Sequence, residues 1–224
     1  MKVPDSAYFG EKLGGRGGIS YGEVRLETNE QTRLLLLQSR INDLLIKQVA
    51  ALAAKDDNGK LLIWSPFPLA ILTLLSIETL GHIISDVATI REKNEHEISK
   101  IIATPIYKLM DKKLSHGVTK KFHKSFEKLH GKEDKKYLDV YSDVIHKYQR
   151  NTFIHGYQAK GVYLTHEQKE AWIIKEDEGY LVINPYLFWE LFKKTYELVF
   201  NDILMNNNSK WRKNALQYLV NLLN

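Results

Sequence analysis

The chain has 224 residues, of which 44% are hydrophobic, so it is long enough to bury a core without disulfide or metal staples. It contains no cysteine, which excludes disulfides, thiolate zinc sites, iron–sulfur clusters and cysteine nucleophiles. The net charge of +5 and the pI of about 9.1 are a modest basic excess, and its placement along the chain matters more than its size.

The first 28 residues are rich in glycine, as in the stretch GEKLGGRGGISYGE that starts at Gly10, and we expect residues 1–28 to form a flexible arm. The stretch lacks the Lys-Ser/Thr ending of a phosphate-binding P-loop, and no predicted strand precedes it. No apolar run follows Lys2, so we expect no secretory signal and a cytoplasmic protein.

Apolar residues recur at helical spacing through much of the following chain. This spacing predicts helices over about 29–55, 68–94 and 94–109, and the sequence DDNG at Asp56–Gly59 predicts a turn after the first of them. The stretch Leu61–Ile84 is the most apolar of the chain. Its prolines and its polar end leave an apolar run shorter than the ~20 residues that a bilayer needs, so we expect a buried core helix and no membrane association.

A basic segment follows between Lys108 and Lys136. Its apolar residues Phe122, Phe126 and Leu129 recur at helical spacing and predict an amphipathic helix whose other faces carry lysines. Clustered lysines bind a phosphate backbone without reading its sequence, so the candidate RNA-binding residues are Lys120, Lys121 and Lys124. A solvated helix face with no ligand is the alternative.

The same segment carries His116, His123 and His130 at intervals of seven residues, which predicts a stripe along one helix. Seven residues rise ~10 Å along a helix, whereas the ligands of a metal lie about 2 Å from it. The three histidines therefore cannot share an ion. We expect neither a metal site nor a cofactor.

The next helix is expected to begin near Glu133 and to present Leu138, Tyr141 and Ile145 on one face before it enters the stretch YQRNTFIHGY, Tyr148–Tyr157. Farther along, two short β-rich runs around a polar turn predict a hairpin over 171–184. A helix opened by Pro185 then runs to about Leu204, and a last helix occupies 209–224.

Arg150 and His155 are the pair of side chains that phosphodiester cleavage needs, since a guanidinium holds charge on phosphate oxygens and an imidazole moves a proton near neutral pH. On one helix they lie about 140° and ~7.5 Å apart, too far to converge easily on one phosphate. Two copies related by a two-fold axis could complete the site, so we expect a homodimer. A polar helix end that satisfies backbone carbonyls is the alternative interpretation.

The sequence R-N-T-F-I-H at Arg150–His155 resembles the R-x-x-x-x-H signature of the HEPN superfamily, all-helical domains of which many are metal-independent ribonucleases. Asn151 matches the polar residue that commonly follows the arginine. The extension to Tyr157 is similar to HEPN toxins paired with a nucleotidyltransferase antitoxin, in which this tyrosine can be modified with adenylate. The chain is longer than those minimal toxins, and its hairpin lies outside their pattern.

The resemblance implies a mainly α protein, a HEPN-type helical bundle over 29–205 with the hairpin 171–184 inserted and the helix 209–224 packed on it. It implies an endoribonuclease of the toxin or antiviral-defence type, in which His155 is the general acid or base, Arg150 stabilises the transition state and Asn151 positions the phosphate or the histidine. A helical RNA-binding or partner-binding module without turnover is the competing hypothesis. Glu78, an acid in an apolar helix, is expected to be paired by packing, with orientation of Arg150 as the alternative.

Overall fold

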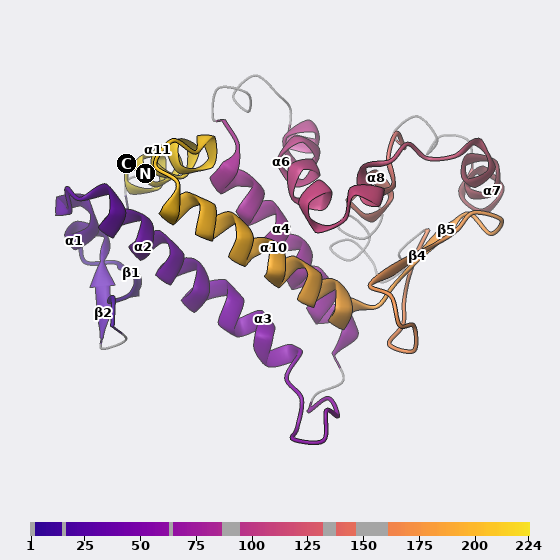
Figure 1. The fold of residues 1–224 in the computed structure, drawn as a ribbon, viewed down its shortest axis with the longest axis horizontal. Helices are drawn as coiled ribbons and strands as arrows, with labels where there is room; N and C mark the ends of the chain where they lie inside the picture. Colours follow the sequence, from indigo (N-terminus) through magenta and orange to yellow (C-terminus); the bar gives the residue numbers. More distant parts are fainter. Residues whose placement is uncertain (1–2, 15–16, 63–64, 87–94, 132–137, 147–160) are drawn as a thin grey trace. The chain divides into compact units, whose positions relative to one another are not determined.

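The computed structural model describes residues 3–14, 17–62, 65–86, 95–131, 138–146 and 161–224 (Figure 1). The chain is mainly α-helical, as the sequence predicts, with small antiparallel and mixed sheets. Its described residues divide between two compact units where the sequence suggested one main domain. Unit 1 draws on Met1–Ala51, His82–Asn94 and Tyr196–Asn224, and unit 2 on Leu52–Gly81 and Glu95–Thr195.

The helical stretch expected over 29–55 forms in unit 1 as α2 (Glu30–Ile41), the π-helical turn η1 (Asn42–Ile46) and α3 (Lys47–Leu52). The side chain of Asn29 caps α2 by accepting a hydrogen bond from the Thr32 amide at 3.0 Å. The last helix, α11 (Lys210–Leu223), begins at the expected place because Ser209 caps it, and it contacts α2.

The described residues of the glycine-rich start form strands and a helix where a flexible arm was expected. Strands β1 (Tyr8–Glu11) and β2 (Gly18–Ser20) form an antiparallel hairpin beside α2, and α1 (Tyr21–Leu26) follows (Figure 1). Phe9 is fully buried and its ring meets the edge of Tyr21 at 5.1 Å. Burial of these aromatic side chains stabilises the hairpin and offsets the conformational entropy that its glycines lose on folding. The glycine content of the sequence alone does not reveal this stabilisation.

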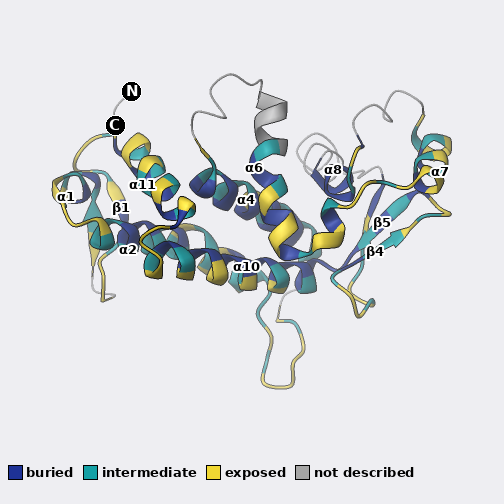
Figure 2. Ribbon diagram, turned by 45° about the horizontal axis from the view of Figure 1, so that its top comes forward, coloured by how far each residue is buried: buried dark blue, intermediate teal, exposed yellow. Residues whose placement is uncertain are grey.

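In unit 2 the most apolar helix is α4 (Pro66–Ile84), which continues into unit 1 at its last residues. Among the helices that the structure describes, it alone is long and apolar enough to cross a membrane by length and composition. Over half of its apolar window, 56%, is buried within the protein, and Figure 2 shows it largely in the colour of buried residues. This burial agrees with the expected core helix.

Helix α6 (Glu95–Met110) packs closely against α4 at Gly81. A side chain at Gly81 would place its Cβ 2.1 Å from the carbonyl oxygen of Ile102, so only glycine permits this approach of the two backbones. After α6 come the 3₁₀ turn η2 (Lys112–Ser115), the basic helix α7 (Lys120–His130) and the short helix α8 (Tyr141–Val144).

The helix expected to begin near Glu133 begins later. Residues 132–137 lie outside the described part of the chain, but Val140 is extended and pairs with Gly117, so the helix starts at Tyr141. The carboxylate of Asp143 accepts the backbone N–H groups of Asp139 and Val140 at 2.9 and 3.1 Å. This capping interaction, rather than the apolar spacing of the segment, sets the start of α8.

The predicted hairpin is formed by β4 (Trp172–Lys175) and β5 (Tyr180–Ile183). A further strand, β3 (Val162–Leu164), pairs parallel to β5 and gives the order β3-β5-β4, which the sequence did not predict. Helix α10 (Pro185–Met205) begins as expected, because the side-chain oxygen of Asn184 accepts the amide of Tyr186 at 3.1 Å.

The turn of this hairpin is fixed on α7. Gly179 has a φ of +73°, and a Cβ there would lie 2.3 Å from the backbone nitrogen of Phe126. A Cβ added at Gly161, just before β3, would lie 2.5 Å from the ring of the same Phe126. Two glycines therefore let both the hairpin turn and the start of β3 lie directly on α7.

Gly179→Ala should lower the free energy of unfolding by at least about 2 kcal/mol, because it adds steric overlap to an unfavourable backbone conformation. Gly59→Ala is the matched control, since Gly59 has a φ of +77° but open space around its Cβ position. It should cost only about 1 kcal/mol. Equal losses for the two variants in urea unfolding would contradict the close packing of the turn on α7.

Candidate functional site

The three proposed catalytic residues, Arg150, Asn151 and His155, and the proposed modification site Tyr157 lie outside the described residues. The elements on either side of them in the sequence are described: α8 and Ile145–His146 before, and β3 after. Both belong to unit 2, as does α7 with the candidate RNA-binding lysines.

Helix α7 is amphipathic, as predicted, although Leu129, the third residue of the predicted apolar face, is 54% exposed. It starts where the hydroxyl of Thr119 accepts the amide of Phe122 at 3.1 Å and ends at Gly131, which has a φ of +91°. Phe122 and Phe126 are buried, and the ring of Phe122 meets the edge of Tyr141 in α8 at 5.5 Å. The apolar side of the basic helix is thus packed on the element that leads toward Arg150.

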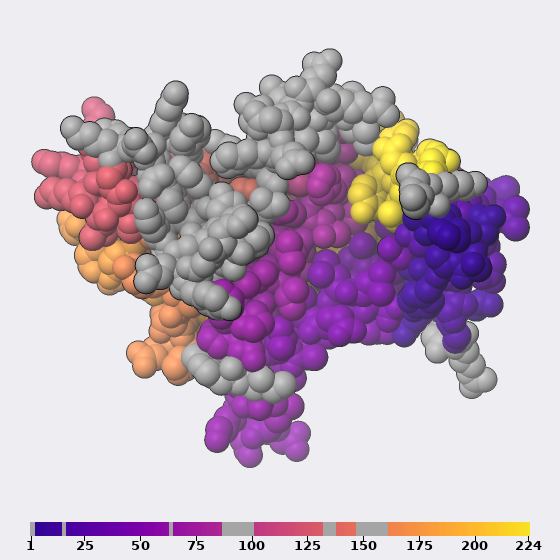
Figure 3. Space-filling model, turned by 180° about the vertical axis from the view of Figure 1, so that it is seen from behind, coloured from indigo at the N-terminus to yellow at the C-terminus, as the bar shows by residue number. Residues whose placement is uncertain are grey.

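The opposite side of α7 carries exposed lysines: Lys120, Lys121, Lys124 and Lys128. Helical geometry places these four positions within about 100° of one another, facing away from the two phenylalanines. Figure 3 shows α7, in pink, forming an outer surface next to the orange atoms of the hairpin. The predicted lysine surface therefore exists.

Only part of that surface is unpaired. The ammonium of Lys121 lies 2.7 Å from the carboxylate of Asp177 in the hairpin turn, which raises the pKa of Lys121, with the charge of Glu176 adding to the effect. Lys120 and Lys124 form no ion pair with any residue in the part of the chain that the structure describes. The three lysines predicted as equivalent are therefore not equivalent.

The expected histidine stripe does not form on α7. His116 precedes the helix, in the extended residue after η2, because Thr119 sets the helix start three residues later. His123 and His130 do lie on α7, and His130 packs 4.5 Å from the ring of Phe126. Within the described ranges, no group of three or more acidic or histidine side chains is placed to hold a metal ion.

A cluster of buried polar side chains lies next to α8 and was not predicted. Nε2 of His146 is 3.8 Å from Oε1 of Glu78, and their side chains are only 7% and 13% exposed. The expectation that Glu78 is paired by packing is met by this contact. Any role in orienting Arg150 stays a prediction. His146 follows the apolar face of α8, and this position is the sequence signal that points to it as the partner of Glu78.

Tyr107 of α6 belongs to the same cluster. It is 1% exposed, and burial, with the carboxylates of Glu78 and Asp143, raises the pKa of its phenol. Its hydroxyl has no hydrogen-bond partner among the residues described. Buried titratable groups of this kind often mark functional sites, so the cluster supports a site beside α8.

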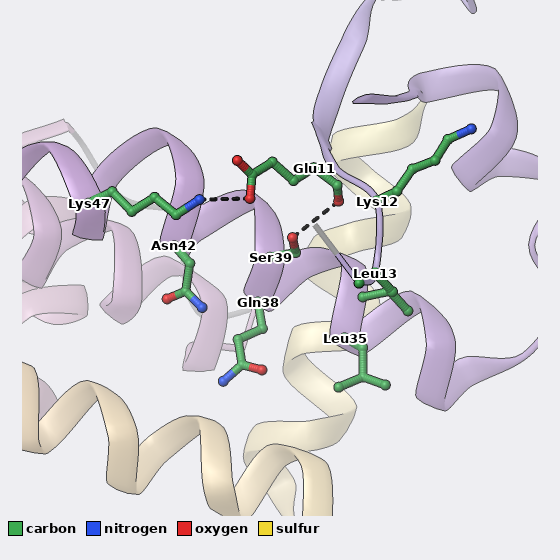
Figure 4. Close-up of a pocket in the computed structure, with 9 residues that line it drawn as sticks. Glu11, Lys12, Leu13, Leu35, Gln38, Ser39, Asn42 and Lys47 are labelled. Carbon is green, nitrogen blue, oxygen red and sulfur yellow. Dashed lines mark hydrogen bonds and ion pairs between the residues drawn. The ribbon is translucent and has the colours of Figure 1, made fainter. Parts of the chain in front are cut away.

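Unit 1 contains a separate pocket of about 240 Å³ between β1 and α2 (Figure 4). The ammonium of Lys47 pairs with the carboxylate of Glu11 at 2.7 Å, and the hydroxyl of Ser39 donates to the Glu11 carbonyl at 3.1 Å. The amide oxygen of Asn42 in its wall accepts from Tyr196 at 2.8 Å. Lys47, Ser39 and Asn42 are thus already bonded within the protein, and we assign the pocket no chemistry.

Comparison of the chain with protein-family models, with curated proteins and with solved structures finds no match.

Tyr107→Phe should leave the free energy of unfolding unchanged or raise it by up to about 1 kcal/mol, since it removes a buried hydroxyl that lacks a partner. Tyr196→Phe is the control: it removes the hydrogen bond to Asn42 and should cost about 1 kcal/mol. Urea unfolding measures both. A loss at Tyr107 as large as that at Tyr196 would show that the Tyr107 hydroxyl is bonded after all.

Proposed function

We propose that the protein is a metal-independent endoribonuclease of the HEPN type. The observation that carries this proposal is the position of α7: its buried face packs on Tyr141 of α8, the element that precedes Arg150, while its lysines face solvent. The exposed lysine face of α7, which suits phosphate binding, is thus on a helix that packs directly on the element leading into the motif.

In the proposed reaction the ribose 2′-oxygen attacks the adjacent phosphorus as its proton passes to a base. The bond to the 5′-oxygen breaks, this oxygen takes up a proton, and the products carry a 2′,3′-cyclic phosphate and a 5′-hydroxyl. His155 would transfer the protons, Arg150 would hold the charge on the phosphate oxygens, and Asn151 would position the phosphate or the histidine. Because the nucleophile is the 2′-hydroxyl, the substrate is RNA.

The spacing of Arg150 and His155 favours a site shared by two copies, so we propose a homodimer. A light-scattering mass of one chain for protein that still cleaves RNA would contradict the shared site. A role as the toxin of a pair or in antiviral defence, with modification of Tyr157 by a nucleotidyltransferase antitoxin, is a further part of the proposal.

His155→Ala should slow RNA cleavage by roughly a hundredfold or more while RNA binding is retained, because only the proton transfer is lost. The wild-type rate should persist in excess EDTA. His116→Ala, at an exposed histidine before α7, is the matched control and should cleave at the wild-type rate. Arg150→Lys should recover little of the activity lost in Arg150→Ala, since an ammonium cannot make the bidentate contact.

Two results would contradict the catalytic proposal. One is folded His155→Ala protein that cleaves RNA as fast as the wild type. That result would favour a binding module without catalytic activity, with the cleavage due to a nuclease that contaminates the preparation. The other is activity that disappears in EDTA and returns with magnesium.

A further inference from the structure

We propose that RNA phosphates bind along the row Lys120, Lys124 and Lys128 of α7. Asp177 is then a specificity determinant, because it pairs with Lys121 and prevents this lysine from binding a phosphate. The inference rests on the proposed function only in taking RNA as the ligand. It changes the expected set of contacts, since it adds Lys128 and removes Lys121.

The row follows from helical geometry. Residues four apart rise about 6 Å along the axis and turn by about 40°, so Lys120, Lys124 and Lys128 form one shallow line of ammonium groups. All three are exposed, and none of them pairs with an acidic side chain of the residues described. Such a line suits a strand that runs along the helix with successive phosphates beside successive lysines.

Lys121 lies at the edge of this row, on the side of the hairpin turn. Its ammonium is 2.7 Å from the carboxylate of Asp177, a distance typical of a charge-assisted hydrogen bond. Glu176 stands next to it in the turn and adds a second negative charge. A phosphate that approached Lys121 would have to displace one carboxylate and remain close to another.

The turn holds these carboxylates in place because it is packed on the helix. Gly179 lies against the backbone of Ser125 and Phe126, where a Cβ would come within 2.5 Å of either residue. The hydroxyl of Tyr141 donates to Glu176 at 3.2 Å and fixes the other side of the turn. Lys121 and Asp177 are both exposed, and an exposed ion pair is weak by itself, but the packed backbone of the turn keeps the Asp177 carboxylate close to Lys121.

The consequence is a lysine surface bounded on one side by the negative charge of the hairpin turn. A strand aligned with the row meets three unpaired ammonium groups, whereas a strand that crosses α7 toward the hairpin meets the carboxylates of Glu176 and Asp177. The turn therefore selects the direction of the bound strand and lowers the affinity for polyanions that cannot follow the row.

The test measures the salt dependence of binding by fluorescence anisotropy, with a labelled single-stranded oligonucleotide whose 2′-hydroxyls are all methylated so that it is bound without being cut. Each lost phosphate contact lowers the slope of log K against log salt by about 0.7. Lys124→Ala and Lys128→Ala should each show this loss, and Lys121→Ala should leave the slope unchanged. Thermal unfolding confirms that each variant is folded.

Asp177→Asn should have the opposite effect, since it frees Lys121 for one more phosphate. The slope should rise by about 0.7 and the affinity should increase roughly three- to sixfold at 0.15 M salt. Glu190→Gln is the matched control, because Glu190 also pairs with a lysine, Lys193 at 3.0 Å, on a different helix. It should change neither the slope nor the affinity beyond the small effect of one charge. The double variant Lys121→Ala, Asp177→Asn should return to the wild-type slope.

The possible results distinguish a failure of this inference from a failure of the proposed function. A slope loss for Lys121→Ala equal to that for Lys128→Ala, or an unchanged slope for Asp177→Asn, overturns this inference and leaves the nuclease proposal intact. Wild-type protein that does not bind the oligonucleotide even at low salt contradicts RNA as the ligand and overturns both.

Discussion

Phe126 is the residue on which the arrangement around α7 depends. It is fully buried, and the backbone of the hairpin turn at Gly179 and of the chain at Gly161 reach it because neither residue has a side chain. Any larger residue at either position would push the sheet off the helix. The packing of the hairpin turn on Phe126 therefore determines which carboxylates lie beside which lysines. In this way the core packing sets the charge pattern of the surface.

The same packing relates that surface to the catalytic hypothesis. Phe122, one turn before Phe126, contacts Tyr141, and the side chains that follow in α8 include the buried Asp143 and, just beyond, His146. Burying an acid or a histidine costs free energy unless a partner is present; Glu78 of α4 lies beside His146, and Asp143 accepts the N–H groups of Asp139 and Val140. The chain thus enters the segment of Arg150 and His155 from an anchored, polar part of the core. Such an anchor is what a site needs if its groups are to be held in place.

Helical spacing predicted much of unit 2 and the end of the chain, and in the structure Thr119, Asn184 and Ser209 each set a helix start there through a local hydrogen bond. What failed depended on contacts between distant residues. The hairpin at the start of the chain exists because Phe9 and Tyr21 are buried together, and β3 exists because it pairs with β5, far along the sequence. Likewise the pairing of Lys121 with Asp177 joins positions 56 residues apart, so no local pattern separates Lys121 from its neighbours. Of the candidate site, the sequence supplied the motif and the lysine surface, whereas His146, Tyr107 and Asp177 required the fold.

The central claim is that the nucleophile belongs to the RNA and that the protein supplies only the proton transfer and the positive charge. It is tested most directly by giving the protein two oligonucleotides of one sequence, one with ribose and one with 2′-O-methyl ribose throughout, in excess EDTA, and identifying the product ends by mass spectrometry. The account predicts that only the ribose strand is cut and that every cut leaves a 2′,3′-cyclic phosphate and a 5′-hydroxyl. Equal cleavage of both strands, or products that carry 5′-phosphates, would contradict it.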